Sequence, residues 1–384
     1  MMDFTLTDEQ RDIAAMVRAL MEEKVGPRAQ EIDERQEFPL WVAELFRGLD
    51  IFGVVVPEEY GGLDGKLVTL CAVQEQIARI VPACSMILGV QGLGSTPILL
   101  FGSEEQKQRW LPAFATGEKM TAFGLTEPNA GSDVKAMTTR AVKEEGGWRL
   151  NGRKCFISHA NIADVVVTFA KVKDEAGHGR ITAFLVETDQ PGYTVDRIEH
   201  KMGLRGSTTC SYVLEDAWVP DENLLGKVGQ GLDVLLATLH KSRIGSAAQS
   251  LGVAQGALDI AAAYAQQREQ FGRPLAKMQT VQLIVGGMVA QVEASRALIY
   301  AAASKYDQGA PRPELEKFSA LAKLFAGDAA MKVATDAVQV MGGYGYCAEY
   351  GAERFMRDAK VFQIFEGANE LHQMQAARLL FTEK

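Results

Sequence analysis

A carboxylate near the end of the chain, Glu366, has unusual neighbours for a charged residue. It follows the apolar Ile364 and Phe365 and precedes Gly367 in the stretch VFQIFEGANELH. Charged side chains are rarely buried without a partner, and a glycine beside one indicates a turn or a close approach by another group. Two interpretations are open at this point. Glu366 is either the solvated end of a helix or a base in an apolar pocket, where burial would raise its pKa toward neutrality.

Two other stretches combine residue types that suit a flat or phosphorylated ligand. FGLTEPNAGSDV (123–134) has small residues, hydroxyls and free backbone N–H groups, which bind phosphates or the edge of a ring. NGRKCFISHAN (151–161) sets the aromatic Phe156 beside the hydroxyl of Ser158, an arrangement that suits a heterocycle. Taken alone, a domain-junction turn and a β-hairpin with a core phenylalanine explain these stretches better.

Arginines and glycines in the last third of the chain form a further candidate. REQFGRPLAKMQ (268–279) contains Arg268 and Arg273, which suit a phosphate; a solvated loop between helices is the alternative. QVMGGYGY (339–346) brings a glycine loop to a helix end, where the backbone can approach a ligand. Neither G-x-G-x-x-G between a strand and a helix nor a Walker A motif occurs, so a nicotinamide or nucleoside triphosphate site lacks its usual signature.

The elements that must position these residues fall into three blocks. Residues 1–118 have helical periodicity, with capping boxes predicted at Thr7–Gln10 and Ser103–Gln106. Residues 119–230 change to short runs rich in Val, Ile, Thr and Phe, with turns predicted at 146–147 and 151–152. Residues 231–384 are helical again and rich in Ala, Gly and Ser. The prediction is an α+β fold: an N-terminal helical domain, a middle β-barrel or sandwich, and a C-terminal four-helix bundle that carries Glu366.

Composition excludes several classes of function. The net charge of −9 and the absence of a basic run make nucleic acid an improbable partner. The five cysteines are far apart and form no C-x-x-C, which argues against a metal site or disulfide framework and favours a reducing compartment. The first residues, MMDFTLTDEQ, lack the regions of a signal peptide, so we expect a cytoplasmic location. Polar residues interrupt the apolar stretches, so core helices are expected rather than membrane spans.

The order and spacing of the motifs, taken together, resemble the acyl-CoA dehydrogenase family, flavoproteins that oxidise acyl-CoA thioesters. The resemblance covers nearly the whole chain, through LTDEQ, PEEYGG, LTEPNAGSD, RGS, REQFGRPL, QVMGGYGY and RDAKVFQIFEG. It implies the three-domain fold, bound FAD, an acyl-CoA substrate, an electron-transferring flavoprotein as electron acceptor, and a homotetramer.

The resemblance also implies a role for individual residues. Glu366 is expected to remove the α-proton of the substrate while the β-hydrogen leaves as hydride to flavin N5, which gives the 2,3-enoyl-CoA. Ser132, Arg243 and Gly367 are the expected substrate contacts. The expected FAD contacts, some of them from a neighbouring subunit, are Leu125, Thr126, Ser132, Phe156, Ile157, Ser158, Arg268, Phe271, Gln279, Gln339, Gly342, Gly343 and Glu370.

The chain departs from the family pattern at two positions, and two other functions stay open. Ala368 stands where a Thr or Ser is common, and His240 stands where an Asp is common. Some branches carry the base directly before the residue that matches Arg243; Ser242 stands there and cannot act as one. The alternatives are an acyl-CoA or nitroalkane oxidase of the same fold and a non-enzymatic assembly protein. The acyl group stays open, although VPACSMILGVQ offers no basic residue to a dicarboxylic acyl group.

Overall fold

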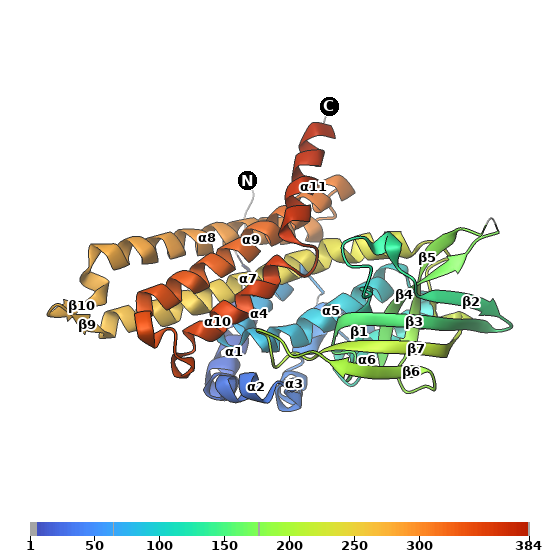
Figure 1. Ribbon diagram of the computed structural model, residues 1–384, viewed down its shortest axis with the longest axis horizontal. Helices are drawn as coiled ribbons and strands as arrows, with labels where there is room; N and C mark the ends of the chain where they lie inside the picture. The colour runs from blue at the N-terminus through green and yellow to red at the C-terminus, as the bar shows by residue number, and fades with distance from the viewer. Residues whose placement is uncertain (1–5, 64, 176, 383–384) are drawn as a thin grey trace.

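The computed structural model describes residues 6–63, 65–175 and 177–382. Figure 1 shows an elongated molecule with long helices along its axis, a sheet at one end and the first helices packed against one side. The helices of the N-terminal part are α1 (Asp8–Leu20), α2 (Ala29–Arg35), α3 (Leu40–Arg47), α4 (Leu67–Ile80), α5 (Pro82–Phe101) and α6 (Glu104–Ala115).

Both predicted capping boxes are present. The Thr7 hydroxyl accepts a hydrogen bond from the N–H of Gln10, and the Gln10 side chain accepts one from the N–H of Thr7. Ser103 and Gln106 make the same reciprocal pair at the start of α6. The two signatures therefore locate the starts of α1 and α6 in the sequence.

The middle part forms one eight-stranded sheet. Its strands follow the order β6-β7-β3-β2-β4-β5-β8, and β1 pairs in parallel with β4. The strands are β1 (Thr121–Gly124), β2 (Arg140–Glu144), β3 (Gly147–Ser158), β4 (Val165–Lys173), β5 (Gly179–Glu187), β6 (Tyr193–Ile198), β7 (Thr209–Pro220) and β8 (Leu224–Leu225).

The turn predicted at Asn151–Gly152 is wrong, because both residues lie inside β3. The register of β3 against β7 shifts between Leu150 and Gly152. A Cβ atom on Gly152 would lie 2.3 Å from the hydroxyl of Thr139. The glycine therefore permits a close approach at a strand irregularity and does not make a hairpin.

The C-terminal part is built around one very long helix, α7 (Gly231–Gln267). It packs against α4, α5, α8 (Gln279–Asp307), α9 (Arg312–Met341) and α10 (Ala352–Ala359). A short hairpin of β9 (Glu269–Gln270) and β10 (Arg273–Pro274) joins α7 to α8. The last helix, α11 (Asn369–Thr382), turns away from the bundle in Figure 1. This arrangement confirms the predicted fold class.

Small residues in α7 bring helix backbones into contact. A Cβ atom on Gly252 would lie 2.5 Å from the carbonyl oxygen of Glu75, and one on Gly256 would lie 2.2 Å from that of Arg79. Both carbonyls belong to α4. Any larger side chain would push α4 away, so the glycines fix the spacing between the first and third parts of the chain.

Among the described residues, two helices, α5 and α8, are long and apolar enough to cross a membrane by length and composition. Most of α5 is buried, as expected for a core helix. Most of α8 is not buried, and it exposes Leu283 and Val289. These exposed apolar residues leave one face of α8 without a packing partner inside the described chain.

Candidate active site

Glu366 lies in a short segment between a 3-10 turn (Lys360–Gln363) and α11. The hydroxyl of Ser242 donates a 2.9 Å hydrogen bond to its carboxylate Oε2. The Nε of Arg243 donates a 3.1 Å hydrogen bond to its backbone carbonyl. Two consecutive residues of α7 therefore hold both the side chain and the backbone of Glu366.

The surroundings of Glu366 have opposing effects on its acidity. Burial of the carboxyl group raises its pKa, whereas the Ser242 hydrogen bond and the charges of Arg243 and Lys323 lower it; the net result is a raised pKa. A carboxylate with these properties is a stronger base than a solvated one. Glu366 is therefore a carboxylate held by α7 within the protein and not the solvated end of a helix.

A side chain at Gly367 would be strained and tightly packed. Its φ of 94° lies in the left-handed region. An added Cβ atom would lie 3.1 Å from the ring of His372 and 3.6 Å from the guanidinium of Arg243. Burial lowers the pKa of His372 to about 4, so its ring is neutral near pH 7. Predicted substrate contacts Arg243 and Gly367 thus lie together beside Glu366, while Glu370 is exposed in the first turn of α11.

A bulge in β3 turns Phe156 outward. The register with β7 shifts between Lys154 and Ile157, Phe156 has a φ of 58°, and its side chain is 65% exposed. The hairpin with a core phenylalanine is therefore wrong. Ile157 is buried. Ser158 at the end of β3 is half-buried.

The loop after β1 is tied to this bulge. The carbonyl of Thr126 accepts a 3.0 Å hydrogen bond from the N–H of Cys155. Leu125 and Thr126 are half-buried, and Ser132 is exposed. The structure thus places Leu125 and Thr126 beside the β3 bulge that carries Phe156, Ile157 and Ser158.

A buried ion pair that the sequence reasoning missed supports this loop. The Nζ of Lys154 lies 2.8 Å from Oε1 of Glu127 and donates a 3.0 Å hydrogen bond to the carbonyl of Leu125. Glu127 also accepts hydrogen bonds from the N–H groups of Thr138 and Thr139. Burial alone would raise the pKa of Glu127, but Lys154 and these hydrogen bonds lower it to about 2. The pair is therefore ionised and holds the loop in place.

Apart from Glu370, the remaining predicted FAD contacts lie at the other end of the bundle. Arg268, Phe271, Gln279, Gln339, Gly342 and Gly343 are all exposed. A hollow of about 490 Å³ brings together Arg268, Gly342 and Gly343, together with Tyr264 and Tyr344. The guanidinium of Arg268 lies 5.4 Å from the ring centre of Tyr344. A Cβ atom on either Gly342 or Gly343 would meet nothing within 4 Å, so the backbone there is open to a ligand.

The two groups of predicted FAD contacts cannot meet within one chain. The 37 residues of α7 span about 55 Å at the usual rise of 1.5 Å per residue. Figure 1 shows the sheet at one end of this helix and the β9–β10 hairpin at the other. Each group is an open surface of the kind that binds part of a large ligand.

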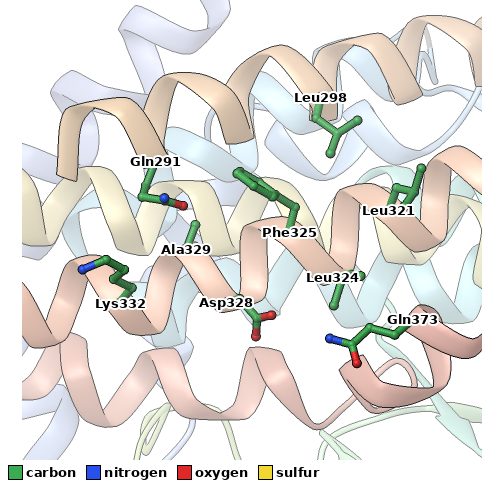
Figure 2. Close-up of a pocket in the computed structure, with 9 residues that line it drawn as sticks. All are labelled: Gln291, Leu298, Leu321, Leu324, Phe325, Asp328, Ala329, Lys332 and Gln373. Carbon is green, nitrogen blue, oxygen red and sulfur yellow. The ribbon is translucent and has the colours of Figure 1, made fainter. Parts of the chain in front are cut away.

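A second hollow, of about 440 Å³, lies between α8, α9 and α11 (Figure 2). None of the predicted site residues lines it. Its lining is mostly apolar, with polar groups at its edge: Gln291, Leu298, Leu321, Leu324, Phe325, Asp328, Ala329, Lys332 and Gln373. Within the described part of the chain, no three His, Cys, Asp or Glu residues are placed to hold a metal ion.

Comparisons with known proteins agree along the whole chain. Sequence models of three acyl-CoA dehydrogenase domains match: the N-terminal domain over residues 7–118, the middle domain over 122–217 and the C-terminal domain over 229–381. An acyl-CoA dehydrogenase of Bacillus subtilis is 42% identical over 98% of both chains. A cyclohex-1-ene-1-carbonyl-CoA dehydrogenase of Geobacter metallireducens is 43% identical, also over 98% of both.

Solved structures give the same result. Butyryl-CoA dehydrogenase from Megasphaera elsdenii superposes with a TM-score of 0.95 at 39% identity, over 99% of this chain and all of the other. A structure described as the electron transferring flavoprotein of Acidaminococcus fermentans gives 0.96 at 41% identity, over the whole of both chains. A glutaryl-CoA dehydrogenase from Mycobacterium smegmatis, solved with FADH2, gives 0.92 at 31% identity, over 99% and 96% of the two chains.

These matches confirm three predictions from the sequence: the family, FAD as its cofactor, and acyl-CoA dehydrogenation as the class of reaction. The similarity extends over whole chains and includes all three domains. The chain belongs to the acyl-CoA dehydrogenase family.

Proposed function

We propose that Glu366 is the base that removes the α-proton of an acyl-CoA thioester, which the protein oxidises to the 2,3-enoyl-CoA. The observation that carries this proposal is the position of Glu366: its carboxylate is held by Ser242, its backbone is held by Arg243, and burial raises its pKa. An α-proton is too weakly acidic for a solvated carboxylate, so a base of raised pKa is required.

The backbone around Glu366 has a second role in this proposal. As negative charge develops on the thioester oxygen, an N–H group aimed at that atom stabilises it by roughly 3–4 kcal/mol. The N–H of Glu366 takes this position. Arg243 and Gly367 lie beside it, and Ser132 contacts the substrate from the middle domain. The bound FAD supplies the acceptor for the β-hydride.

The proposed FAD site is shared between copies of the chain. Leu125, Thr126, Ser132, Phe156, Ile157 and Ser158 of one copy hold the flavin end, together with Glu370. The residues at the far end of α7 in a second copy hold the rest: Arg268, Phe271, Gln279, Gln339, Gly342 and Gly343. The distance between the two groups supports a homo-oligomer, for which we propose a homotetramer. The exposed apolar face of α8 and the hollow between α8, α9 and α11 (Figure 2) further support association between copies of the chain.

The proposed electron acceptor is an electron-transferring flavoprotein, which the similarity to the Acidaminococcus fermentans structure supports. The proposed location is the cytoplasm, which is consistent with five free cysteines. The proposed acyl groups are monocarboxylic, since the segment 81–91 carries no basic residue.

The test is anaerobic reduction of the bound flavin by a panel of acyl-CoA thioesters, followed by turnover with an artificial acceptor. Wild-type protein should lose its flavin absorbance with at least one thioester. Glu366→Gln should retain FAD but lose turnover by about 10⁴-fold or more, as when a catalytic group is removed. Near-normal turnover in the variant contradicts the assignment, and steady peroxide formation without an acceptor would favour the oxidase alternative.

A further inference from the structure

Lys323 is a fully buried lysine on α9, beneath the segment that carries Glu366. Its Nζ donates a 2.7 Å hydrogen bond to the carbonyl of Gly367 and a 2.8 Å hydrogen bond to Oδ1 of Asn369. A buried ammonium is costly unless its N–H groups find acceptors. Both acceptors lie within three residues of Glu366, so the cost of burying Lys323 is offset at this segment.

The segment has a backbone conformation that must be held in place. Glu366 has a φ of 58° and Gly367 a φ of 94°, so two consecutive residues are in the left-handed region. This conformation costs a non-glycine residue of the order of 1 kcal/mol or more and persists only where the surroundings impose it. The carbonyl of Glu366 is held by Arg243 from α7, and the carbonyl of Gly367 by Lys323 from α9.

Further contacts with α9 fix both ends of the segment. The Asn369 amide donates hydrogen bonds to the carbonyl of Leu324 (3.2 Å) and to Oδ1 of Asp328 (2.8 Å). The same Asp328 oxygen accepts a 2.7 Å hydrogen bond from the side chain of Gln363. Residues 363–369 are therefore attached to one helix at their start, middle and end, and Lys323 makes the middle attachment.

The charge of Lys323 also acts on Glu366. Burial lowers the pKa of Lys323 to about 8, which leaves most of it protonated at pH 7; Arg243 lowers it as well, and Glu366, Asp328 and Glu370 oppose this effect. His372, which also faces this group, is neutral near pH 7. The Lys323 ammonium in turn lowers the pKa of Glu366, against the effect of burial.

We propose that Lys323 is a positioning residue for the base: it fixes the Glu366–Gly367 backbone and keeps the Glu366 carboxylate ionised while the substrate covers it. The proposal rests on the proposed role of Glu366. Lys323 touches no reacting atom, so its effect is exerted through the residues that it holds.

Two substitutions separate its hydrogen bonds from its charge. Lys323→Met removes the donors and the charge at similar length, whereas Lys323→Gln keeps a donor without a charge. Lys360→Met is the matched control, because Lys360 is an exposed lysine of the neighbouring turn that donates a hydrogen bond to Gln363. The measurements on FAD-loaded protein are FAD content, the anaerobic rate of flavin reduction, and kcat/KM as a function of pH.

Lys323→Met should slow flavin reduction by about 10²-fold, the effect of a misplacement near 1 Å, with a much smaller change in KM. The acid limb of its kcat/KM profile, where activity falls at low pH, should move to higher pH, because loss of a neighbouring cation raises the pKa of the base. Lys323→Gln should recover part of the rate but keep the displaced acid limb, and Lys360→Met should match the wild type. If Lys323→Met does not fold, Asn369→Ala tests the attachment: its rate should fall with no movement of the acid limb.

Wild-type rates and an unmoved acid limb in Lys323→Gln would overturn the proposal. A loss of rate with an unmoved acid limb in both lysine variants would also overturn it, because a merely structural residue behaves in this way. Failure of the proposed function looks different. In that case Glu366→Gln retains turnover, or no thioester reduces the wild-type flavin, whatever residue stands at position 323.

Discussion

The hydroxyl of Ser242 donates a 2.9 Å hydrogen bond to the carboxylate of Glu366, across 124 residues of sequence. Ser242 occupies the position where some branches of the family carry the base. In this chain the residue at that position therefore holds Glu366, the proposed base, and lowers its pKa.

Ser242→Ala should move the acid limb of kcat/KM to higher pH. The base acts when deprotonated, and loss of a hydrogen bond to the carboxylate raises its pKa. The expected shift is roughly one pH unit, since a hydrogen bond to a charged group contributes about 1.5 kcal/mol or more. FAD content is the internal control and should not change. An acid limb at the wild-type pH would show that the hydrogen bond is absent when substrate is bound.

Lys154→Met should destabilise the protein and weaken FAD binding. It leaves Glu127 as an unpaired buried carboxylate, and breaking a buried pair in this way costs about 3–5 kcal/mol. The carbonyl of Leu125 would also lose its hydrogen bond from Lys154. The measurements are the unfolding midpoint in urea and the Kd for FAD. Adding Glu127→Gln removes the unpaired carboxylate and should recover part of the stability that Lys154→Met loses. No recovery in the double variant would contradict the prediction, because it would show that the unpaired charge is not the cause of the loss.

Two inactive variants should complement each other if two chains share each FAD site. Glu366→Gln damages the base, and Arg268→Gln damages the far group. In a mixed pair, one site contains the intact Glu366 and the intact Arg268, and the other contains both substitutions. Differently tagged chains, co-expressed and purified through both tags, should show roughly half of the wild-type turnover per pair, as expected for an interface repeated by symmetry. Activity no higher than that of the separate variants would show that the two residues serve different sites.

Buried histidines should make the protein sensitive to mild acid. Burial lowers the pKa of His159 to about 3 and that of His372 to about 4, below the usual 6.5. The unfolded chain therefore binds more protons than the folded one below about pH 6.5, and stability falls as pH decreases from there toward 4. His372→Gln should reduce the fall in Tm between pH 7 and 4.5. Asp358, whose pKa burial raises to about 6, acts in the opposite direction in both proteins and cancels in the comparison. Equal slopes in both proteins would contradict the prediction.

Local signals in the sequence predicted the helix starts, because a capping box needs only residues three apart. The same kind of reasoning failed at Asn151–Gly152, where the reason for the glycine is Thr139, the residue directly before the neighbouring strand β2. For the site, motif order led to Glu366, but only the structure shows its contacts with Ser242 and Arg243, more than 120 residues away. Likewise, the separation between the two groups of predicted FAD contacts follows from the length of α7, which only the structure shows.

Lys154 and Lys323 were missed because a lysine in a sequence is normally assigned to the surface. For Lys323 the sequence did hold a signal. Ala320 and Gly327, three residues before it and four after it, lie on the same helix face and are buried. A lysine within a stripe of small buried residues indicates a buried cation with acceptors elsewhere in the fold. No comparable pattern marks Lys154, whose partner Glu127 belongs to a loop.

The backbone contacts at Gly252 and Gly256 have a consequence for how such a chain can change over evolution. Because α4 lies directly on α7, the N-terminal block completes the core of the C-terminal bundle. The three blocks that sequence models recognise are thus not interchangeable modules. A recombination event that replaces residues 1–118 must therefore supply an α4 whose surface fits these two glycines. Otherwise α7, the longest helix described, loses one of the helices that it packs against.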